Sequence, residues 1–352
     1  MQRAFLVLFL LFSCSSSAFA FGIGARAMAM GGAYSALAND ISSAYWNPAG
    51  LVNSDIKVTD VMVGEGVDGN FGLEKVPEFI NSLYLIKSYW NRDADFMGSV
   101  NGIAGLSLSK VGVSYIPWAT VNFSKDSANT YVYYDGTSRH SVALTFGSSI
   151  GMPLILSPVA VGANVRYVSG FLNRVSWTWP GPANITYASG SGIGLDLGAQ
   201  TNILPNTKAA LVFRDVLTGF TWSGKTDIHS GGFNTTGDLF PKTGEEDFEE
   251  VDKSPMKIVL GVASDIPMIA LLSADYEYAD PNADIHIGIE KKFFMNIFAL
   301  RAGYYTESAT QTSKTTYGCG LDFGFIKADV AVGQDAKVSD DKILVMSASA
   351  VI

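Results

Sequence analysis

The sequence has 352 residues, enough for one large domain or two ordinary ones, and 48% of them are hydrophobic. Its mean hydropathy of +0.21 is high for a soluble protein. After residues 1–20, however, no segment approaches the roughly 18 consecutive apolar residues of a transmembrane helix. The formal net charge of −9 makes nucleic acid an unsuitable partner, because a phosphate backbone repels an acidic protein. The apolar residues must therefore be distributed over many short elements.

Residues 1–20 are predicted to be a signal peptide, which places the mature protein outside the cytoplasm. Arg3 precedes an apolar run that ends at Phe12, and Ala18-Phe19-Ala20 has the A-x-A pattern of a cleavage site. An alternative is a lipoprotein that is cleaved before Cys14, although Phe12 stands where such sites usually have a small residue.

From about residue 100 onward, apolar residues alternate with small or polar ones, which predicts β-strands. The clearest segments are 138–147, 192–200, 272–278, 285–290, 317–324 and 344–352. A soluble sandwich would also alternate, but here the residues opposite the apolar ones are Gly, Ser and isolated charges rather than long, solvated side chains. We therefore predict an all-β fold, a transmembrane antiparallel β-barrel of about 14 strands (12 are possible), with apolar residues facing lipid.

The connections between these segments alternate in length, as expected when short periplasmic turns face long extracellular loops. Short links are predicted at residues 110, 151–158, 204–206, 265–267, 292–296 and 324–325, and longer ones at 124–137, 169–190, 219–255, 279–284, 306–315 and 333–342. The first strand is expected at 56–63. The interval 64–101 is expected to be a partly helical loop, because apolar residues in 76–90 recur at steps of three and four. Loop 219–255 is acidic, which favours a solvated loop over a calcium site.

Residues 21–55, between the signal peptide and the barrel (56–352), differ from the rest of the chain. Small residues dominate, so this segment can pack against itself in a confined space. Gly31-Gly32 permits a sharp turn, and Asp40 can cap a short helix over 41–46. Asn47 is pushed toward an extended conformation by the proline that follows it. We predict a compact hatch that fills the lumen of the barrel.

Two motifs in this segment, Arg26-Ala-Met-Ala-Met-Gly-Gly-Ala-Tyr34 and Tyr45-Trp-Asn-Pro-Ala-Gly-Leu51, resemble the start of mature proteins in the long-chain fatty acid transporter (FadL-like) superfamily, and more closely its PorV/PorQ and TraF-like branches. The resemblance implies a 14-stranded barrel with an N-terminal hatch. The chain departs from common outer-membrane barrels in ending at Ile352 instead of an aromatic residue. The hatch-motif residues that the resemblance implies are Arg26, Gly31, Gly32, Asn47, Pro48, Ala49 and Gly50.

Pro117 interrupts an otherwise regular strand pattern over 111–123. Proline removes one ladder hydrogen bond, so one interpretation is a kink that opens a side portal, similar to the kinked third strand of the fatty acid transporters. The alternative is that Pro117 lies where the strand already ends above the membrane.

Polar residues of the barrel are expected to face the lumen and to pair around the hatch: Asn164, Arg166, Asp196, Arg214, Lys257, Asp275, Glu277, His286, Glu290, Arg301, Asp322, Lys327 and Asp329.

The sequence offers no catalytic, metal or cofactor site, so we predict a protein that is not an enzyme and needs no cofactor. It contains no H-E-x-x-H motif. His286 and Glu290 lack further ligands at a recognisable spacing, and His140 and Ser141 point to opposite faces of one strand. Cys319 is interpreted as a small apolar filler.

These features favour a barrel in the bacterial outer membrane that lets hydrophobic or amphipathic small molecules diffuse through it. The expected partners are outer-membrane lipid and a hydrophobic ligand. One alternative is a PorV-like barrel that serves as a shuttle or anchor in protein secretion or surface assembly, and another is a TraF-like envelope or conjugation protein. Partner proteins from those systems are expected only in these alternatives.

Overall fold

The computed structural model describes residues 23–53, 57–68, 82–108, 110–151, 157–252, 254–308, 311–335 and 342–351. The predicted signal peptide and Ile352 lie outside these residues. Short helices occur at α2 (Ala25–Ala29), α3 (Ser43–Trp46), η1 (Pro48–Asn53) and α4 (Ser82–Ser88). The strands are β1 (Lys57–Asp68), β2 (Ala94–Leu108), β3 (Val111–Lys125), β4 (Tyr131–Ile150), β5 (Val159–Thr178), β6 (Ala183–Leu204), β7 (Thr207–His229), β8 (Gly244–Asp252), β9 (Lys257–Ile266), β10 (Ala270–Ala279), β11 (Asn282–Phe293), β12 (Phe298–Glu307), β13 (Thr312–Asp322), β14 (Ile326–Asp335) and β15 (Lys342–Val351).

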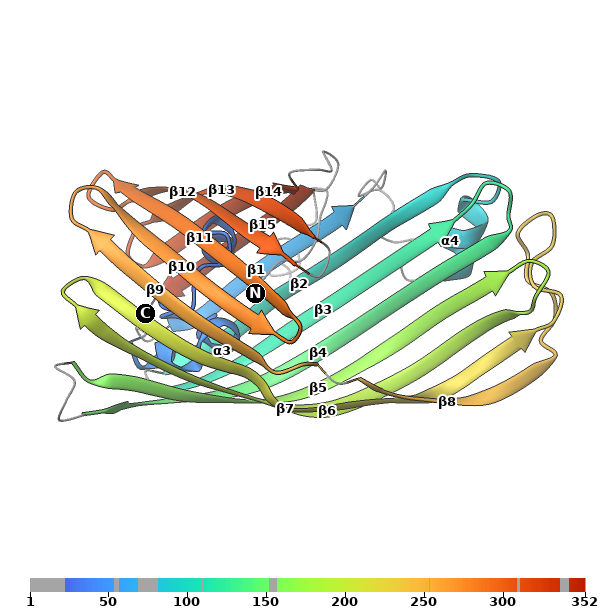
Figure 1. Cartoon of the computed structure of the whole chain (residues 1–352), viewed down its shortest axis with the longest axis horizontal. Coiled ribbons are helices and arrows are strands. Elements are labelled where there is room, and N and C mark those ends of the chain that lie inside the picture. The colour runs from blue at the N-terminus through green and yellow to red at the C-terminus, as the bar shows by residue number, and fades with distance from the viewer. Residues whose placement is uncertain are drawn as a thin grey trace.

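The strands form one antiparallel sheet that closes on itself (Figure 1). β1 pairs with both β2 and β15, and β7 pairs with β6 and then with two further strands. Its first part, from Thr207 to Arg214, pairs with β9, and its later part, from Phe220 to Ile228, pairs with β8. β8 and β9 therefore share one position in the wall, so the 15 strands fill 14 positions. The prediction of an all-β barrel with about 14 strands is confirmed.

The wall is much taller on one side than on the other (Figure 1). β6 and β7 have 22 and 23 residues, whereas β10 and β12 have 10 each. At about 3.3 Å per residue, the long strands project roughly 40 Å farther than the short ones. We call this projecting part, formed by β3–β8, the extension, and the opposite end, where β6 turns into β7 and β9 into β10, the short-turn end.

The extension corrects the predicted long loops. Residues 169–190 are mostly strand, with only 179–182 between β5 and β6, and β3 and β4 take up most of 124–137. The predicted acidic loop 219–255 consists largely of the end of β7 and of β8. In 64–101, strand β1 continues to Asp68 and β2 begins at Ala94. These segments mix polar residues with apolar ones such as Tyr134 and Trp177, and their backbones continue the same ladder.

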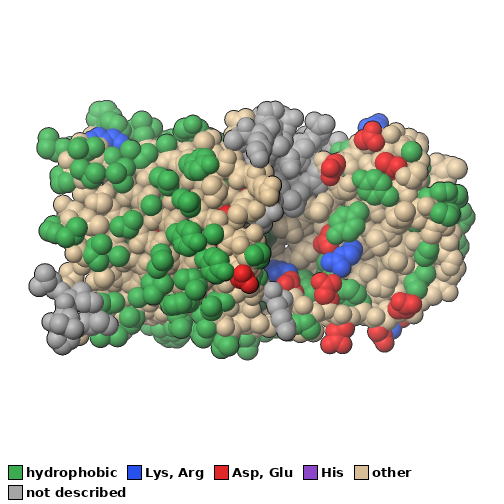
Figure 2. All heavy atoms as spheres, viewed as in Figure 1, with side chains coloured by type: hydrophobic (Ala, Val, Ile, Leu, Met, Phe, Trp, Pro, Cys, Tyr) green, Lys and Arg blue, Asp and Glu red, His purple; other side chains and the backbone are tan. Residues whose placement is uncertain are grey.

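The outer face of the barrel is apolar, as expected for a surface in contact with lipid. Figure 2 shows hydrophobic side chains spread over the part of the molecule that holds β9–β15, whereas charged side chains gather over the extension. Exposed side chains of this outer belt include Val113, Val142, Val165, Ile193, Leu260, Leu272, Ile287, Leu300, Tyr317 and Val332. Among the described residues, no helix is both long enough and apolar enough to cross a membrane.

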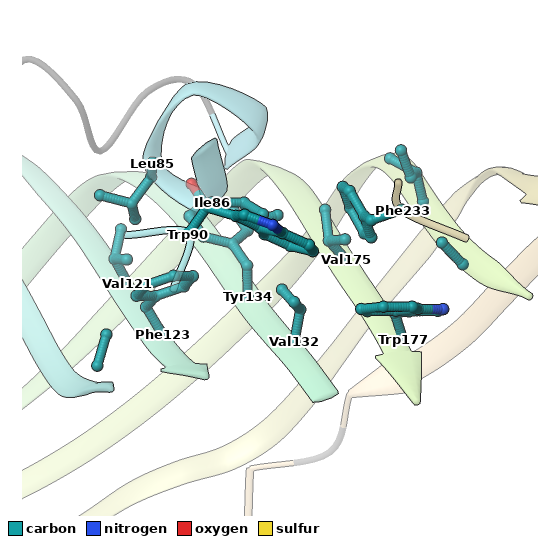
Figure 3. Close-up of a cluster of buried hydrophobic side chains, with 13 residues drawn as sticks. Leu85, Ile86, Trp90, Val121, Phe123, Val132, Tyr134, Val175, Trp177 and Phe233 are labelled. Carbon is teal, nitrogen blue, oxygen red and sulfur yellow. The ribbon is translucent and has the colours of Figure 1, made fainter. Parts of the chain in front are cut away.

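Helix α4 packs against β4 and β5 of the extension (Figure 3). The helix helps to bury Phe123 of β3 and Tyr134 of β4, which are opposite each other in the ladder. Each is an even number of residues from an exposed residue of its own strand, Tyr115 in β3 and Val142 in β4. Phe123 and Tyr134 therefore lie on the lipid-side face of the sheet. Trp90 stacks on Trp177 with ring centroids 6.1 Å apart. Of the helix predicted at 76–90, residues 76–81 lie outside the described residues, and α4 forms in the remainder.

The segment that precedes β1, residues 23–53, lies inside the barrel at the short-turn half, and we call it the plug. Helix α2 packs on β12–β15, and η1 packs on β4–β6. Gly31 and Gly32 have φ values of +65° and +76°, which L side chains rarely adopt. On the wall, a Cβ atom at Gly162 would lie 2.3 Å from the carbonyl carbon of Pro48, so the plug fits only against a bare backbone.

We predict that Gly162→Ala disturbs the seating of the plug and lowers the free energy of unfolding by about 1–3 kcal/mol, the usual cost of overpacking. Urea unfolding of the folded barrel measures the loss, and trypsin cleavage at Arg26 reports release of the plug. Gly219→Ala is the matched control, because no atom would lie within 4 Å of its Cβ. Equal behaviour of the two variants would show that the plug does not bear on Gly162.

Candidate functional site

The plug is fixed to the wall by a buried carboxylate between two guanidinium groups. Arg26 of α2 donates from Nε and Nη2 to Glu290 of β11, both at 2.9 Å. Arg301 of β12 donates from Nε to the same carboxylate at 2.6 Å and from Nη1 to Asp329 of β14 at 2.6 Å. The side chain of Glu290 has no solvent exposure. Such a pair is strong only while both partners are present, because an unpaired buried charge is costly.

The turn after α2 is held by two further wall residues. The Asp275 carboxylate of β10 accepts hydrogen bonds from the backbone N–H groups of Tyr34 and Ser35, at 3.0 and 2.8 Å. His286 of β11 lies with Nδ1 2.7 Å from the Gly31 carbonyl oxygen, so that nitrogen must carry the proton. Burial raises the pKa of the Tyr34 phenol, which is therefore neutral. These backbone N–H and C=O groups of the turn thus form hydrogen bonds with wall residues instead of with water.

The second motif of the plug forms a turn against β4–β6. Asn47 donates from Nδ2 to the Ser35 carbonyl at 2.9 Å, and its Oδ1 accepts from the N–H of Ala49 at 3.0 Å. Gly50 approaches the Ala38 backbone so closely that a Cβ atom would lie 2.1 Å from its oxygen. The structure thus brings all seven predicted hatch residues into the plug: Arg26, Gly31, Gly32, Asn47, Pro48, Ala49 and Gly50.

A cavity of about 330 Å³ lies on the extension side of the plug, bordered by Tyr45. Its cations are already paired: Arg166 contacts Asp196 at 3.0 Å and Asp215 at 2.5 Å. Arg139 pairs with Asp252 and lies over the ring of Phe220, 5.1 Å from its centroid. Trp118 and Ile116 add apolar surface. A lining of aromatic rings and neutralised ion pairs suits an apolar molecule with a small polar group.

A larger cavity, of about 980 Å³, lies on the other side of the plug at the short-turn end. Arg26, Leu37 and Asn39 of the plug border it, together with the turns after β6, β9 and β11. The plug therefore stands between two cavities along the axis of the barrel.

An apolar contact lies between these cavities, and we call it the plug seam. It is formed by Leu37, Tyr45 and Trp46 of the plug against Ala210, Ala263 and Leu271 of β7, β9 and β10. Tyr45 lines the cavity on the extension side, whereas Leu37, Ala263 and Leu271 line the cavity at the short-turn end. At the extension end of the seam, Arg214 of β7 donates from Nη2 to the Trp46 carbonyl oxygen at 3.2 Å. Among the described residues, no hydrogen bond or ion pair joins the side chains of Leu37, Ala210, Ala263 and Leu271. The contacts in this part of the seam are therefore weak individually and non-directional.

Pro117 lies inside β3, which continues to Lys125, and is paired with His140 of β4. On the β2 side, the ladder skips 102–103 opposite 116–117, as expected where proline offers no N–H. A second interruption lies elsewhere, where 215–219 of β7 face the break between β8 and β9. Asp215 has a φ of +54° at this break. The portal at Pro117 stays a prediction.

The sequence predicted that most of the charged residues described above face the lumen. The structure pairs Arg166 with Asp196 and Arg301 with Glu290. The prediction missed Arg139, Asp215 and Phe220, which line the cavity on the extension side. Their signal was present, because Arg139 shares the lumen face with Ser141 in the alternation of β4. Within the described residues, no group of three or more His, Cys, Asp or Glu is placed to hold a metal ion.

Fold and site together define a membrane-spanning β-barrel whose lumen is closed by an N-terminal plug. Among solved structures, the chain is similar to the CymD monoaromatic hydrocarbon channel, with a TM-score of 0.64 and 14% identity over 94% of this chain and 98% of that one. It is also similar to the Ralstonia pickettii toluene transporter TbuX (TM-score 0.63, 14% identity, 94% and 98% covered) and to a Pseudomonas aeruginosa FadL homologue (TM-score 0.63, 11% identity, 95% and 99% covered).

These likenesses show that the chain has the FadL-like barrel fold, which confirms the fold predicted from the plug motifs. They give no support to the closer PorV/PorQ or TraF-like resemblance. No protein-family model and no curated protein sequence matches the chain.

We predict that Glu290→Gln loosens the plug, because two guanidinium groups lose their shared counter-ion. The expected loss in the free energy of unfolding is about 3–5 kcal/mol, measured by urea unfolding, with faster trypsin cleavage at Arg26. Glu245→Gln is the control, since Glu245 pairs with Lys225 and Lys242 on the solvated extension, where ion pairs contribute little. Wild-type stability of Glu290→Gln would rule out this carboxylate as the anchor of the plug.

Proposed function

We propose that the protein is a channel of the bacterial outer membrane that lets hydrophobic or amphipathic small molecules diffuse past its plug. The observation that carries this proposal is the plug seam, an apolar contact with a cavity at each end. Three of the similar structures are described as a monoaromatic hydrocarbon channel, a toluene transporter and a FadL homologue, which agrees with a channel for apolar cargo.

The contacts around the seam explain how a path can open without removing the plug. Polar bonds hold the plug on β10–β12 through Asp275, His286 and Glu290. On β7, Arg214 also bonds the Trp46 carbonyl oxygen. The part of the seam that can open is therefore the apolar cluster around Leu37, Ala210 and Ala263, where only van der Waals contacts must separate. An apolar molecule entering the seam replaces these contacts with similar ones, so the cost of opening is largely recovered.

The first test is uptake by a Gram-negative host that lacks its own channels for such compounds. Cells that produce the protein should take up radiolabelled dodecanol faster than cells with an empty vector, and both should take up a polar sugar of similar size at the same rate. Equal dodecanol uptake in both strains would refute the channel.

We predict that Ala263→Leu blocks the seam and lowers dodecanol uptake at least about fivefold, since the added side chain fills the gap between plug and wall. The matched control is Ala331→Leu. Ala331 is an equally small and buried wall residue, but it packs against Ala25 and Met28 on another side of the plug. Both variants overpack the lumen, at a cost of about 1–3 kcal/mol, so their melting temperatures are compared. Equal loss of uptake in both variants would place the path outside the seam.

A further inference from the structure

A lysine stands at the point where the plug seam opens into the short-turn cavity. Lys208 of β7 is directly opposite Ala263 of β9 in the ladder. It is two residues from the buried Ala210, so its side chain points to the lumen on the same face as the seam residues. Lys208 and Arg26 both line the cavity of about 980 Å³. Any molecule that leaves the seam at this end passes the Lys208 ammonium.

Nothing described in the structure neutralises this half-buried cation. Among the described residues, none forms a hydrogen bond or an ion pair with the Lys208 ammonium, and the charge that acts on it most is the like charge of Arg26. A cation that is partly removed from water and has no counter-ion is unfavourable. This arrangement leaves an unfilled place for an anion.

The other end of the same two strands is built differently. There Arg214 of β7 and Lys257 of β9 are also opposite each other, but Glu277 of β10 accepts from both, at 3.2 Å and 2.6 Å. The two cations at the extension end of the seam thus share one carboxylate, whereas Lys208, about 20 Å farther along β7, has no acidic partner among the described residues. Of these two ends of the β7–β9 pair, only the Lys208 end is left without an acidic partner.

The rest of the cavity suits the head of an amphiphile. Lys292 of β11 lines it, and its ammonium is 4.0 Å from Glu290, whose carboxylate already serves Arg26 and Arg301. The described lining residues include two acids, Glu290 and Asp265. Asp265 does not pair with a guanidinium group, and it lies exposed on the rim. Apolar side chains complete the lining: Leu37, Ile203, Leu204, Ile266, Ile269 and Leu271.

We propose that this cavity is an anion site that takes the acidic head group of an amphiphile, with Lys208 as its principal contact and Lys292 as a second. The inference builds on the proposed function, because the apolar chain of the same molecule would occupy the seam. The head group is a carboxylate on a transported molecule or the phosphate of a membrane lipid. Charge-assisted hydrogen bonds from ammonium groups recognise either one.

The test measures binding to the full-length barrel in a non-ionic detergent, with cis-parinaric acid as the fluorescent probe. Dodecanoate should displace the probe at least tenfold better than dodecanol. Lys208→Met should reduce this preference roughly tenfold while leaving the affinity for dodecanol unchanged, since a charge-assisted hydrogen bond is lost. Lysophosphatidylglycerol and lysophosphatidylcholine form a second pair of competitors that distinguishes a lipid phosphate from a carboxylate.

Lys225→Met is the matched control, because Lys225 lies on the same strand but on the solvated extension, paired with Glu245 and Asp247. It should keep the wild-type preference. The melting temperature of Lys208→Met is expected to equal that of the wild type, because the side chain has no described partner to lose. A preference for dodecanoate that survives in Lys208→Met would overturn the anion site. Dodecanol uptake that continues in that case leaves the channel intact, whereas absent uptake of both compounds in wild type refutes the channel itself.

Discussion

The shared carboxylate of Glu290 is the interaction on which the plug depends. It joins α2 of the plug to β11 and β12 at a place where the Glu290 side chain itself has no solvent exposure. The low polarity of that place makes the pair strong when complete and costly when broken. The turn at Gly31-Gly32 and the hydrogen bonds from Tyr34 and Ser35 to Asp275 follow directly after this anchor in the chain, so they take their position from it.

This anchor divides the surface of the plug into parts with different mechanical properties. Where Glu290, Asp275 and His286 act, contacts are directional and a small shift breaks them. At Ala210 and Ala263, small side chains meet Leu37 without directional bonds, so a small shift costs little. The plug is also bonded to β5–β7 through Asn164, Gln200 and Arg214. A small shift confined to the Leu37 face of the plug can therefore admit a molecule while the plug remains in the barrel.

The sequence contained enough to predict the barrel and the plug, because alternation and small-residue composition are local properties. It could not reveal the extension: 169–190 and the acidic 244–252 form strands by pairing with their neighbours, and the apolar Trp177 is covered by Trp90 from a distant part of the chain. Nor could it reveal the seam or the isolation of Lys208, since these depend on which strand faces which part of the plug. Ala263 and Lys208 are 55 residues apart in the chain and become neighbours only through the β7–β9 ladder.

Helix α4 has a consequence for how the protein sits in its membrane. It covers the lipid-side face of β3–β5 directly beyond the exposed apolar belt, and its own outer residues include the charged Lys87, which pairs with Asp238. If the bilayer covered the Lys87–Asp238 pair, both charges would lose their hydration. We therefore expect the helix to limit how deeply this side of the barrel enters the membrane.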